Sequence, residues 1–256
     1  MTSARGTLHL VPNTLDFGPP DAVSRLADVI PLGVIRVAAR LEHWLGENAK
    51  TTRAFLKRVD AVVPLAQPLQ SIEIVELPRP LKGRPGKAPE FDGARLLAPA
   101  LRGRDMGVLS EAGLPGIADP GAAAVEAAHG LGLEVVALPG ASSLLLALAA
   151  SGLNGQSFAF VGYLPTDPAA RAARVEELEA LSRRLAQTQL MIETPYRNSA
   201  LLAALLDQLQ GSTRLSVSCG LTWPGGFTRS GPVNEWKKRP ISLPADMPAV
   251  FSLLGS

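Results

Sequence analysis

Short apolar runs alternate with helical patterns along most of the chain, and glycine, proline and polar residues separate them. In the first half this pattern predicts strands at 7–11, 33–39 and 71–77, from Met106, and at 134–138. It predicts helices at 20–30, 51–59, from Pro120 to Gly130, and at 144–151. Alternating strands and helices are typical of an α/β domain with a parallel sheet.

The second half repeats this alternation after a polar joint at residues 154–157. We predict strands at 158–161, 189–193 and 214–218, helices at 168–185 and 199–210, and a last apolar run at 249–254. In the long helix one face is apolar and carries Val175, Leu178, Leu181 and Leu185. The chain is therefore expected to form two α/β domains, residues 1–153 and 154–256.

Two loops of the first domain have the composition of a ligand-binding site. In Ser110–Gly121 a strand ends in a bend of small residues that carries one carboxylate, Glu111, before the helix that starts at Pro120. In the second loop the next strand leads through Pro139-Gly-Ala into a helix with Ser142 at its start. Ligands bind in crevices at the carboxyl ends of strands in open α/β sheets, and small residues let them approach the backbone.

This crevice suits a ligand with a ribose, an adenine or a zwitterionic tail. Glu111 would accept from hydroxyls or an ammonium group, and the helix N-termini offer free N–H donors. Taken singly, Ser142 is better interpreted as a helix cap and Glu111 as an exposed turn residue. The two loops together favour binding.

Other chemistries lack their signatures in this chain. The G-x-G-x-x-G fingerprint is absent after the first strand, as are a phosphate loop and H-E-x-x-H, and Gly140–Leu144 lacks the last glycine of a nucleophile elbow. The single cysteine, Cys219, excludes an internal disulfide. The histidines, at 9, 43 and 129, are too far apart for a ligand-spaced cluster, so no metal is expected.

Charge and hydropathy indicate which partners and which cellular location to expect. A net charge of +2 permits a nucleic-acid partner without arguing for one. Residues 78–89 hold four Pro, two Gly and four Lys or Arg, which predicts an exposed loop, either simply solvated or in contact with an anionic partner. The first residues lack a signal-peptide pattern, and no apolar run approaches the ~20 residues of a membrane span. We therefore expect a cytoplasmic protein with no membrane partner.

Five segments occur in the order and spacing of a known family. They read Ser110-Glu-Ala-Gly-Leu-Pro-Gly-Ile-Ala-Asp-Pro-Gly121, Leu138-Pro-Gly-Ala-Ser142, Ser151-Gly-Leu153, Phe160-Val-Gly-Tyr-Leu-Pro165 and Glu193-Thr-Pro-Tyr-Arg197. With them the chain resembles the tetrapyrrole methylase superfamily of S-adenosylmethionine-dependent methyltransferases. Within it the chain is most similar to the ribosomal RNA small subunit methyltransferase I family, as a divergent member.

The resemblance implies a two-domain tetrapyrrole methylase-like fold, with S-adenosyl-L-methionine in a cleft between the domains, and a homodimer. By position in the motifs, the cofactor would contact residues of both domains: Leu15, Glu111, Gly113, Leu114, Ser142, Ser143, Met191 and Pro248. The family's E-D-T-R-x-T-R reads Glu47-Asn-Ala-Lys-Thr-Thr-Arg53 here, which implies that Glu47, Lys50 and Arg53 orient the acceptor. A solvated helix start is the alternative for these three residues.

The implied function is methyl transfer to RNA, as in ribose 2'-O-methylation of 16S ribosomal RNA, with ribosomal RNA or the small ribosomal subunit as partner. Two alternatives stay open: a small, tetrapyrrole-like acceptor, or a catalytically silent relative that binds the cofactor or a partner. The loop at 13–18 departs from the family's T-P-I-G-N-L, which raises the question whether Asp16 supplies an acid there. Trp223 and Trp236 could stack on bases, but a position in the core or an interface is favoured for both.

Overall fold

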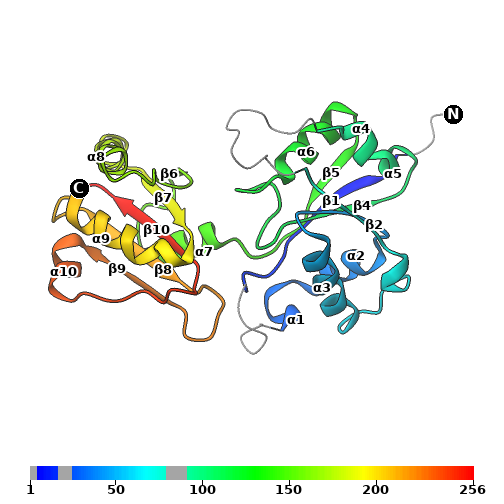
Figure 1. The fold of residues 1–256 in the computed structure, drawn as a ribbon, viewed down its shortest axis with the longest axis horizontal. Helices are drawn as coiled ribbons and strands as arrows, with labels where there is room; N and C mark the ends of the chain where they lie inside the picture. The colour runs from blue at the N-terminus through cyan, green and yellow to red at the C-terminus, as the bar shows by residue number, and fades with distance from the viewer. Residues whose placement is uncertain (1–4, 17–24, 79–90) are drawn as a thin grey trace. The chain divides into compact units, whose positions relative to one another are not determined.

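The computed structural model describes residues 5–16, 25–78 and 91–256, whose contacts form two compact units (Figure 1). The first unit contains the described residues up to Ala141, and the second contains residues 142–256. Each unit holds a five-stranded sheet and helices, so the predicted two-domain α/β fold is confirmed. The basic loop predicted at 78–89 and the start of the helix predicted at 20–30 lie largely outside the described residues.

All strands of the first sheet are parallel, in the order β3-β2-β4-β1-β5. The strands are β1 (Thr7–Val11), β2 (His43–Gly46), β3 (Glu73–Glu76), β4 (Met106–Leu109) and β5 (Glu134–Ala137). One face packs against α1 (Leu26–Val29), α2 (Leu32–Arg40) and α3 (Ala49–Asp60), followed by the short turn η2 (Leu69–Ser71). The other face packs against α4 (Gly93–Leu96), α5 (Ala98–Leu101) and α6 (Gly121–Gly130). Because both faces are covered, every residue of β4 is buried.

The strand predicted at 33–39 is wrong, since this segment is the helix α2. Its β-branched residues favour a strand in isolation, but its buried positions are Val34, Ile35, Ala38 and Ala39. These positions repeat with the period of a helix, and they face the core shared with α3. Burial of one helical face thus outweighs local propensity.

The second sheet is mixed, in the order β6-β7-β10-β8-β9. Its strands are β6 (Phe158–Phe160), β7 (Thr188–Glu193), β8 (Arg214–Cys219), β9 (Phe227–Pro232) and β10 (Ala249–Leu254), and only β6 and β7 pair in parallel. One face packs against α8 (Pro168–Leu185), α9 (Asn198–Gln208), which follows the turn η3 (Pro195–Arg197), and α10 (Val233–Lys238). In the described part of the chain, no helix is both long and apolar enough to cross a membrane.

Helix α7 (Ser143–Ser151) packs on the opposite face of this second sheet. Ala147 and Leu148 are buried against Leu190 of β7 and Val250 of β10. The side chain of Ser230 in β9 also donates to the carbonyl of Ser151, at 2.6 Å. The division predicted after residue 153 puts this helix in the first domain, whereas its packing places it with the second sheet.

Helix α8 has the predicted bounds but a different buried face. Val175 and Leu178 are buried as predicted, together with Glu179 and Ser182, while Leu185 is exposed. A carboxylate tolerates burial when N–H and O–H donors satisfy it. Glu179 accepts from the amide of Gln210 at 2.9 Å and from the hydroxyl of Thr213, so it ties α8 to the loop before β8.

His9 lies on the central strand β1 and is 6% exposed. Its Nε2 is 3.7 Å from the Asp105 carboxylate, too far for a hydrogen bond, and neither ring nitrogen has a hydrogen-bond partner. Burial therefore lowers the pKa of His9 below 6.5, with the positive charge of Arg40 acting in the same direction, although the Asp105 carboxylate opposes the shift. The fold therefore favours the neutral form of this imidazole over the charged form.

We predict that His9 makes the fold less stable in mild acid. Because its folded-state pKa lies below 6.5, the unfolded chain binds the proton more readily, so the free energy of unfolding falls as the pH drops through 6.5 toward the folded-state pKa. One proton contributes a slope of at most about 1.4 kcal/mol per pH unit. Urea unfolding between pH 7.5 and 5.5 measures this slope, which should decrease in His9→Gln. His129→Gln, at an exposed histidine of α6, is the control, and an equal slope in both variants would contradict the prediction.

Candidate functional site

The loops that follow β1, β2 and β4 meet at one edge of the first sheet, because these strands are parallel neighbours. The loop after β4 lies between the other two. It contains Glu111 and Gly113, while Asn13 follows β1 and Glu47 follows β2. Three segments that are far apart in sequence thereby form one cluster at the carboxyl ends of the strands, where ligands bind in such sheets.

Asn13 fastens the loop after β1 to the loop after β4. Its backbone forms an isolated antiparallel bridge with Gly113, with the Asn13 amide donating to the Gly113 carbonyl at 2.9 Å. Its buried side-chain amide donates to the carbonyls of Ser110 and Glu111, at 3.1 Å each. Gly113 has a φ of +68°, which glycine adopts without strain, and an added Cβ would lie 3.4 Å from both Leu15 Cδ2 and the Ala141 carbonyl.

Glu111 is held from the β2 side by two contacts. Its backbone amide donates to Glu47 Oε1 at 2.8 Å. The hydroxyl of Thr51, in the first turn of α3, lies 3.0 Å from Glu111 Oε1 and 2.9 Å from the Asn48 carbonyl, so its one proton serves either acceptor. We call Asn13, Glu47, Thr51 and Glu111 the Glu111 cluster. Both of its carboxylate side chains, Glu47 and Glu111, are partly exposed.

Lys50 and Arg53 do not join the Glu111 cluster. Asn48 caps α3 by accepting from the amides of Lys50 and Thr51, at 2.8 and 3.4 Å, which directs the first helical turn. Both cations are exposed, and neither pairs with a carboxylate among the described residues. The guanidinium of Arg53 reaches only the carbonyl of Ala49 in its own helix, at 3.5 Å. Of the three residues implied for the acceptor, only Glu47 contacts Glu111.

Arg58, which sequence reasoning missed, joins α3 to the loop after β1. Its Nη1 donates to the hydroxyl of Thr14 at 2.9 Å, and its Nη2 lies 3.3 Å from the carboxylate of Asp16, whose side chain is fully buried. Asp16 therefore forms an ion pair beside the cluster. The signal is the spacing Thr51, Phe55, Arg58, which places these residues in one row along α3, at the border of its buried face.

Asp119, the second acid of the loop after β4, has a structural role. Its carboxylate accepts from the amides of Gly116 at 2.9 Å and Gly121 at 2.6 Å, and so closes the turn before α6. Burial raises the pKa of this carboxyl group, while hydrogen bonds from Gly116 and Gly121 oppose the shift. With Asp119 occupied by the turn, Glu111 is the carboxylate this loop offers to a ligand.

The other predicted cofactor contacts lie in three places. Leu15 is buried beside Gly113, and Leu114 is half-buried after it. Ser142 is the N-cap of α7, with its hydroxyl accepting from the Leu145 amide at 3.5 Å, and Ser143 begins the helix, so the capping role of Ser142 is confirmed. In the second unit Met191 is fully buried in β7, and the carbonyl of Pro248 accepts from Gly220 at 2.9 Å. Cofactor binding by these residues stays a prediction.

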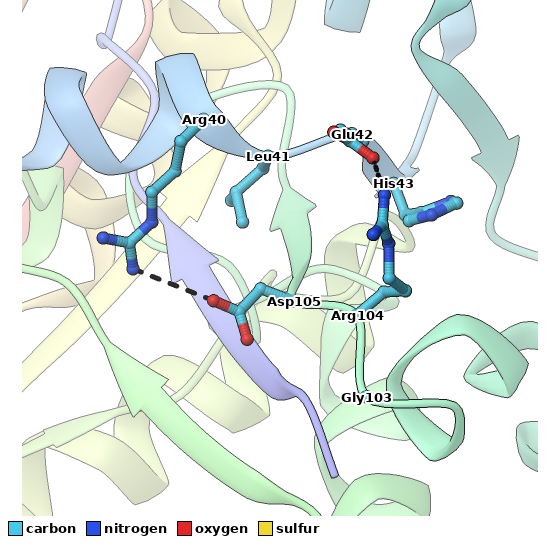
Figure 2. A pocket seen from close by; sticks show the side chains of 7 residues that line it. All are labelled: Arg40, Leu41, Glu42, His43, Gly103, Arg104 and Asp105. Carbon is cyan, nitrogen blue, oxygen red and sulfur yellow. Dashed lines mark hydrogen bonds and ion pairs between the residues drawn. The ribbon is translucent and has the colours of Figure 1, made fainter. Parts of the chain in front are cut away.

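A pocket of about 260 Å³ lies at the opposite edge of the first sheet, at the amino-terminal ends of β2 and β4 (Figure 2). Its charged groups are paired: Arg40 lies 3.8 Å from Asp105, and Arg104 bonds to Glu42. None of the residues predicted for the cofactor or acceptor lines it. The described residues also contain no cluster of three or more His, Cys, Asp or Glu suited to a metal ion.

Comparisons of sequence identify related proteins. A family model described as Tetrapyrrole (Corrin/Porphyrin) Methylases matches residues 27–236. Ribosomal RNA small subunit methyltransferase I of Pseudomonas aeruginosa is 34% identical over 144 residues, which are 56% of this chain and 50% of that protein. The protein of the same name from Bacillus subtilis is 34% identical over 169 residues, 65% of this chain and 56% of that protein. The matched part of the chain thus spans about half the length of these curated relatives.

Solved structures share the fold. The crystal structure of the methyltransferase CobJ matches with a TM-score of 0.52 and 16% identity, over 99% of this chain and 95% of that chain. The native form of uroporphyrin III C-methyl transferase from Thermus thermophilus matches with a TM-score of 0.50 and 17% identity, over 97% of each chain. At this identity the likeness concerns the fold alone, and it agrees with the fold that the motifs imply.

We predict that Arg58 contributes more to stability than Arg53, although both lie on α3. Arg58→Met removes the contacts to Thr14 and Asp16, so the buried carboxylate of Asp16 loses its ion pair with the guanidinium of Arg58. Since Arg58 is partly exposed, the loss should be about 1–3 kcal/mol of unfolding free energy, below that of a fully buried pair. Arg53→Met, at an exposed position, should change it by less than about 0.5 kcal/mol.

Urea unfolding of both variants measures the difference. Asp16→Asn combined with Arg58→Met should cost less than the sum of the two single variants, because the two residues share one interaction. Equal losses at positions 53 and 58, or strict additivity of the double variant, would contradict a stabilising pair.

Proposed function

Because the chain belongs to the tetrapyrrole (corrin/porphyrin) methylases, we propose that it is an S-adenosylmethionine-dependent methyltransferase that acts on RNA. The observation that carries the proposal is the Glu111 cluster, at the carboxyl ends of three parallel strands in a chain of this family. The RNA acceptor is supported by the relatives from Pseudomonas aeruginosa and Bacillus subtilis, whose names refer to ribosomal RNA.

The Glu111 cluster fits the chemistry of this cofactor. When bound, S-adenosylmethionine supplies an electrophilic methyl group on a sulfonium sulfur. The same molecule carries an ammonium group and ribose hydroxyls, which are donors for carboxylate oxygens. Glu47 and Glu111 place two negative charges at this edge, and Gly113 leaves room for close approach to the backbone. Leu15 and Leu114 border the same loop and would contact the apolar parts of the ligand.

The second unit would add contacts that the family resemblance implies. These are Ser142 and Ser143 at the start of α7, with Met191 inside β7 and Pro248 directly before β10. A homodimer in the cytoplasm is proposed on the same ground.

On the acceptor side, Lys50 and Arg53 are exposed cations in the first two turns of α3, the helix that follows Glu47 in the chain. A phosphate group of RNA would pair with such cations, while Glu47 stands near the reacting hydroxyl. The catalytic gain would come mainly from holding donor and acceptor in line, with a carboxylate within reach of the hydroxyl proton. The alternative is methyl transfer to a small-molecule acceptor, and the substrate assay described below distinguishes it from transfer to RNA.

We predict that the chain binds S-adenosylmethionine and S-adenosylhomocysteine through Glu111. Glu111→Gln keeps the size of the side chain and removes its charge, so both ligands should bind about tenfold to a hundredfold more weakly, as for a lost hydrogen bond to a charged group. Isothermal titration calorimetry of each ligand measures the effect. Glu126→Gln, at an exposed position of α6, is the matched control and should bind as the unsubstituted chain does.

Transfer of a labelled methyl group to ribosomal RNA tests the acceptor. We expect transfer to small-subunit RNA, and a reduced rate in Arg53→Ala with unchanged cofactor affinity. A folded chain that binds neither ligand would overturn the methyltransferase proposal. Cofactor binding with transfer only to a small tetrapyrrole acceptor would overturn the RNA acceptor.

A further inference from the structure

The large aromatic side chains of this chain divide into buried and exposed groups. All three tryptophans are buried: Trp44 and Trp236 are each 1% exposed and Trp223 is 7% exposed. The favoured prediction for Trp223 and Trp236, burial, is therefore confirmed, and neither is placed to stack on bases. The indole N–H of Trp236 donates to the Leu215 carbonyl at 2.9 Å inside the second core. The two tyrosines, in contrast, are the most exposed large hydrophobic residues in the described part of the chain.

Tyr196 is 75% exposed and Tyr163 is 59% exposed. Both follow strands that pair in parallel, since Phe160 of β6 lies opposite Leu190 of β7 and the Ile192 amide donates to the Gly162 carbonyl at 3.1 Å. Tyr163 comes directly after Gly162, and Tyr196 lies in η3 directly after β7. The two phenol rings therefore belong to the same edge of the second sheet.

The residues next to each tyrosine are anchored while the rings stay in solvent. Leu164 is 3% exposed and packs in the second core. Arg197 lies 2.9 Å from the buried carboxylate of Glu193, which also accepts from the Thr194 amide at 2.8 Å. A firmly held backbone with outward aromatic rings is suited to binding, because little side-chain or loop entropy is lost on contact.

A cation stands beside this edge. Arg171 lies in the first turn of α8, donates to the Thr166 carbonyl at 3.3 Å, and forms no ion pair with any described residue. It lines a groove of about 370 Å³ between α8 and α9, whose other lining includes Ala172, Ala200, Ala203 and Ala204. The groove's one carboxylate, Asp207, lies about two helical turns beyond Ala200. Asp167, which caps α8 by accepting from the Ala170 amide at 2.9 Å, is an exposed carboxylate of the same segment, and Arg171 is the cation of the groove.

We propose that Tyr163, Tyr196 and Arg171, which we call the tyrosine surface, bind an unpaired RNA strand. Aromatic rings stack on the faces of bases, which are accessible only where the strand is not paired, and an unpaired guanidinium matches a phosphate. The inference rests on the proposed function, in which RNA is the acceptor. It adds a part of the second unit to the RNA contact and requires the RNA to be single-stranded there.

Fluorescence anisotropy with labelled oligoadenylate, beside the same sequence in a duplex, tests the tyrosine surface. We expect the single strand to bind more tightly. Tyr163→Ala and Tyr196→Ala should each weaken its binding about fivefold to a hundredfold, and Tyr163→Phe and Tyr196→Phe should retain most of the affinity. Arg171→Gln should reduce the slope of log Kd against log salt by about 0.7, the value for one single-strand phosphate.

Matched controls come from the same elements. Phe158→Leu removes an exposed aromatic ring from the other end of β6, and Arg184→Gln removes an exposed cation from the other end of α8. Both should leave RNA affinity unchanged. The tyrosine surface is overturned if the alanine variants bind the oligonucleotide as tightly as the unsubstituted chain, or if they only lose self-association in sedimentation, which would assign the tyrosines to contact with a second copy.

The outcomes separate this inference from the proposed function. If the chain binds S-adenosylmethionine and methylates RNA, and the alanine variants do so equally well at low RNA concentration, the function stands and the tyrosine surface fails. If the chain binds the oligonucleotide through the tyrosines but transfers no methyl group to RNA, the surface stands and the proposed acceptor fails.

Discussion

The bridge between Asn13 and Gly113 is the contact on which the candidate site depends. Parallel strands bring their carboxyl ends to one edge, but the loops beyond them are free to diverge unless hydrogen bonds join them. The buried Asn13 side chain supplies two such bonds to the loop that carries Glu111, at 3.1 Å each. The positive φ of Gly113 lets the backbone turn there without strain. The position of Glu111 relative to Glu47 and Thr51 follows from this junction.

The charges around this junction have different burial and therefore different roles. Asp16 is fully buried and pairs with Arg58, an arrangement that holds helix α3 to the loop after β1. Glu47 and Glu111 remain partly exposed to solvent while each also contacts the protein. A buried carboxylate needs a partner from the protein, whereas a half-buried one can exchange water for a ligand at lower cost. An acidic side chain thus stabilises the fold in the loop after β1, whereas acidic side chains in the loops after β2 and β4 are accessible to a ligand.

Aromatic residues show the same division in the second unit. Trp236 stabilises the core through its packing and its bond to Leu215, with the guanidinium of Arg229 over its ring at 4.2 Å. Tyr163 and Tyr196 contribute little to that core, because their rings are mostly exposed. Exposed aromatic rings on well-anchored loops are common where a protein meets a partner. In this unit the buried aromatic residue stabilises the core, and the exposed aromatic residues are available to bind a partner.

Sequence by itself determined the α/β class, the bounds of the long helix 168–185, the family and the strand-end loop with Glu111, because periodicity and ordered motifs are local properties. It did not determine that 33–39 is helical or that Glu179 is buried. Nor did it pair Asp16 with Arg58, 42 residues apart. Only the tertiary structure decided these, since burial and partners depend on which distant segments pack against each residue, and that packing can outweigh local preference.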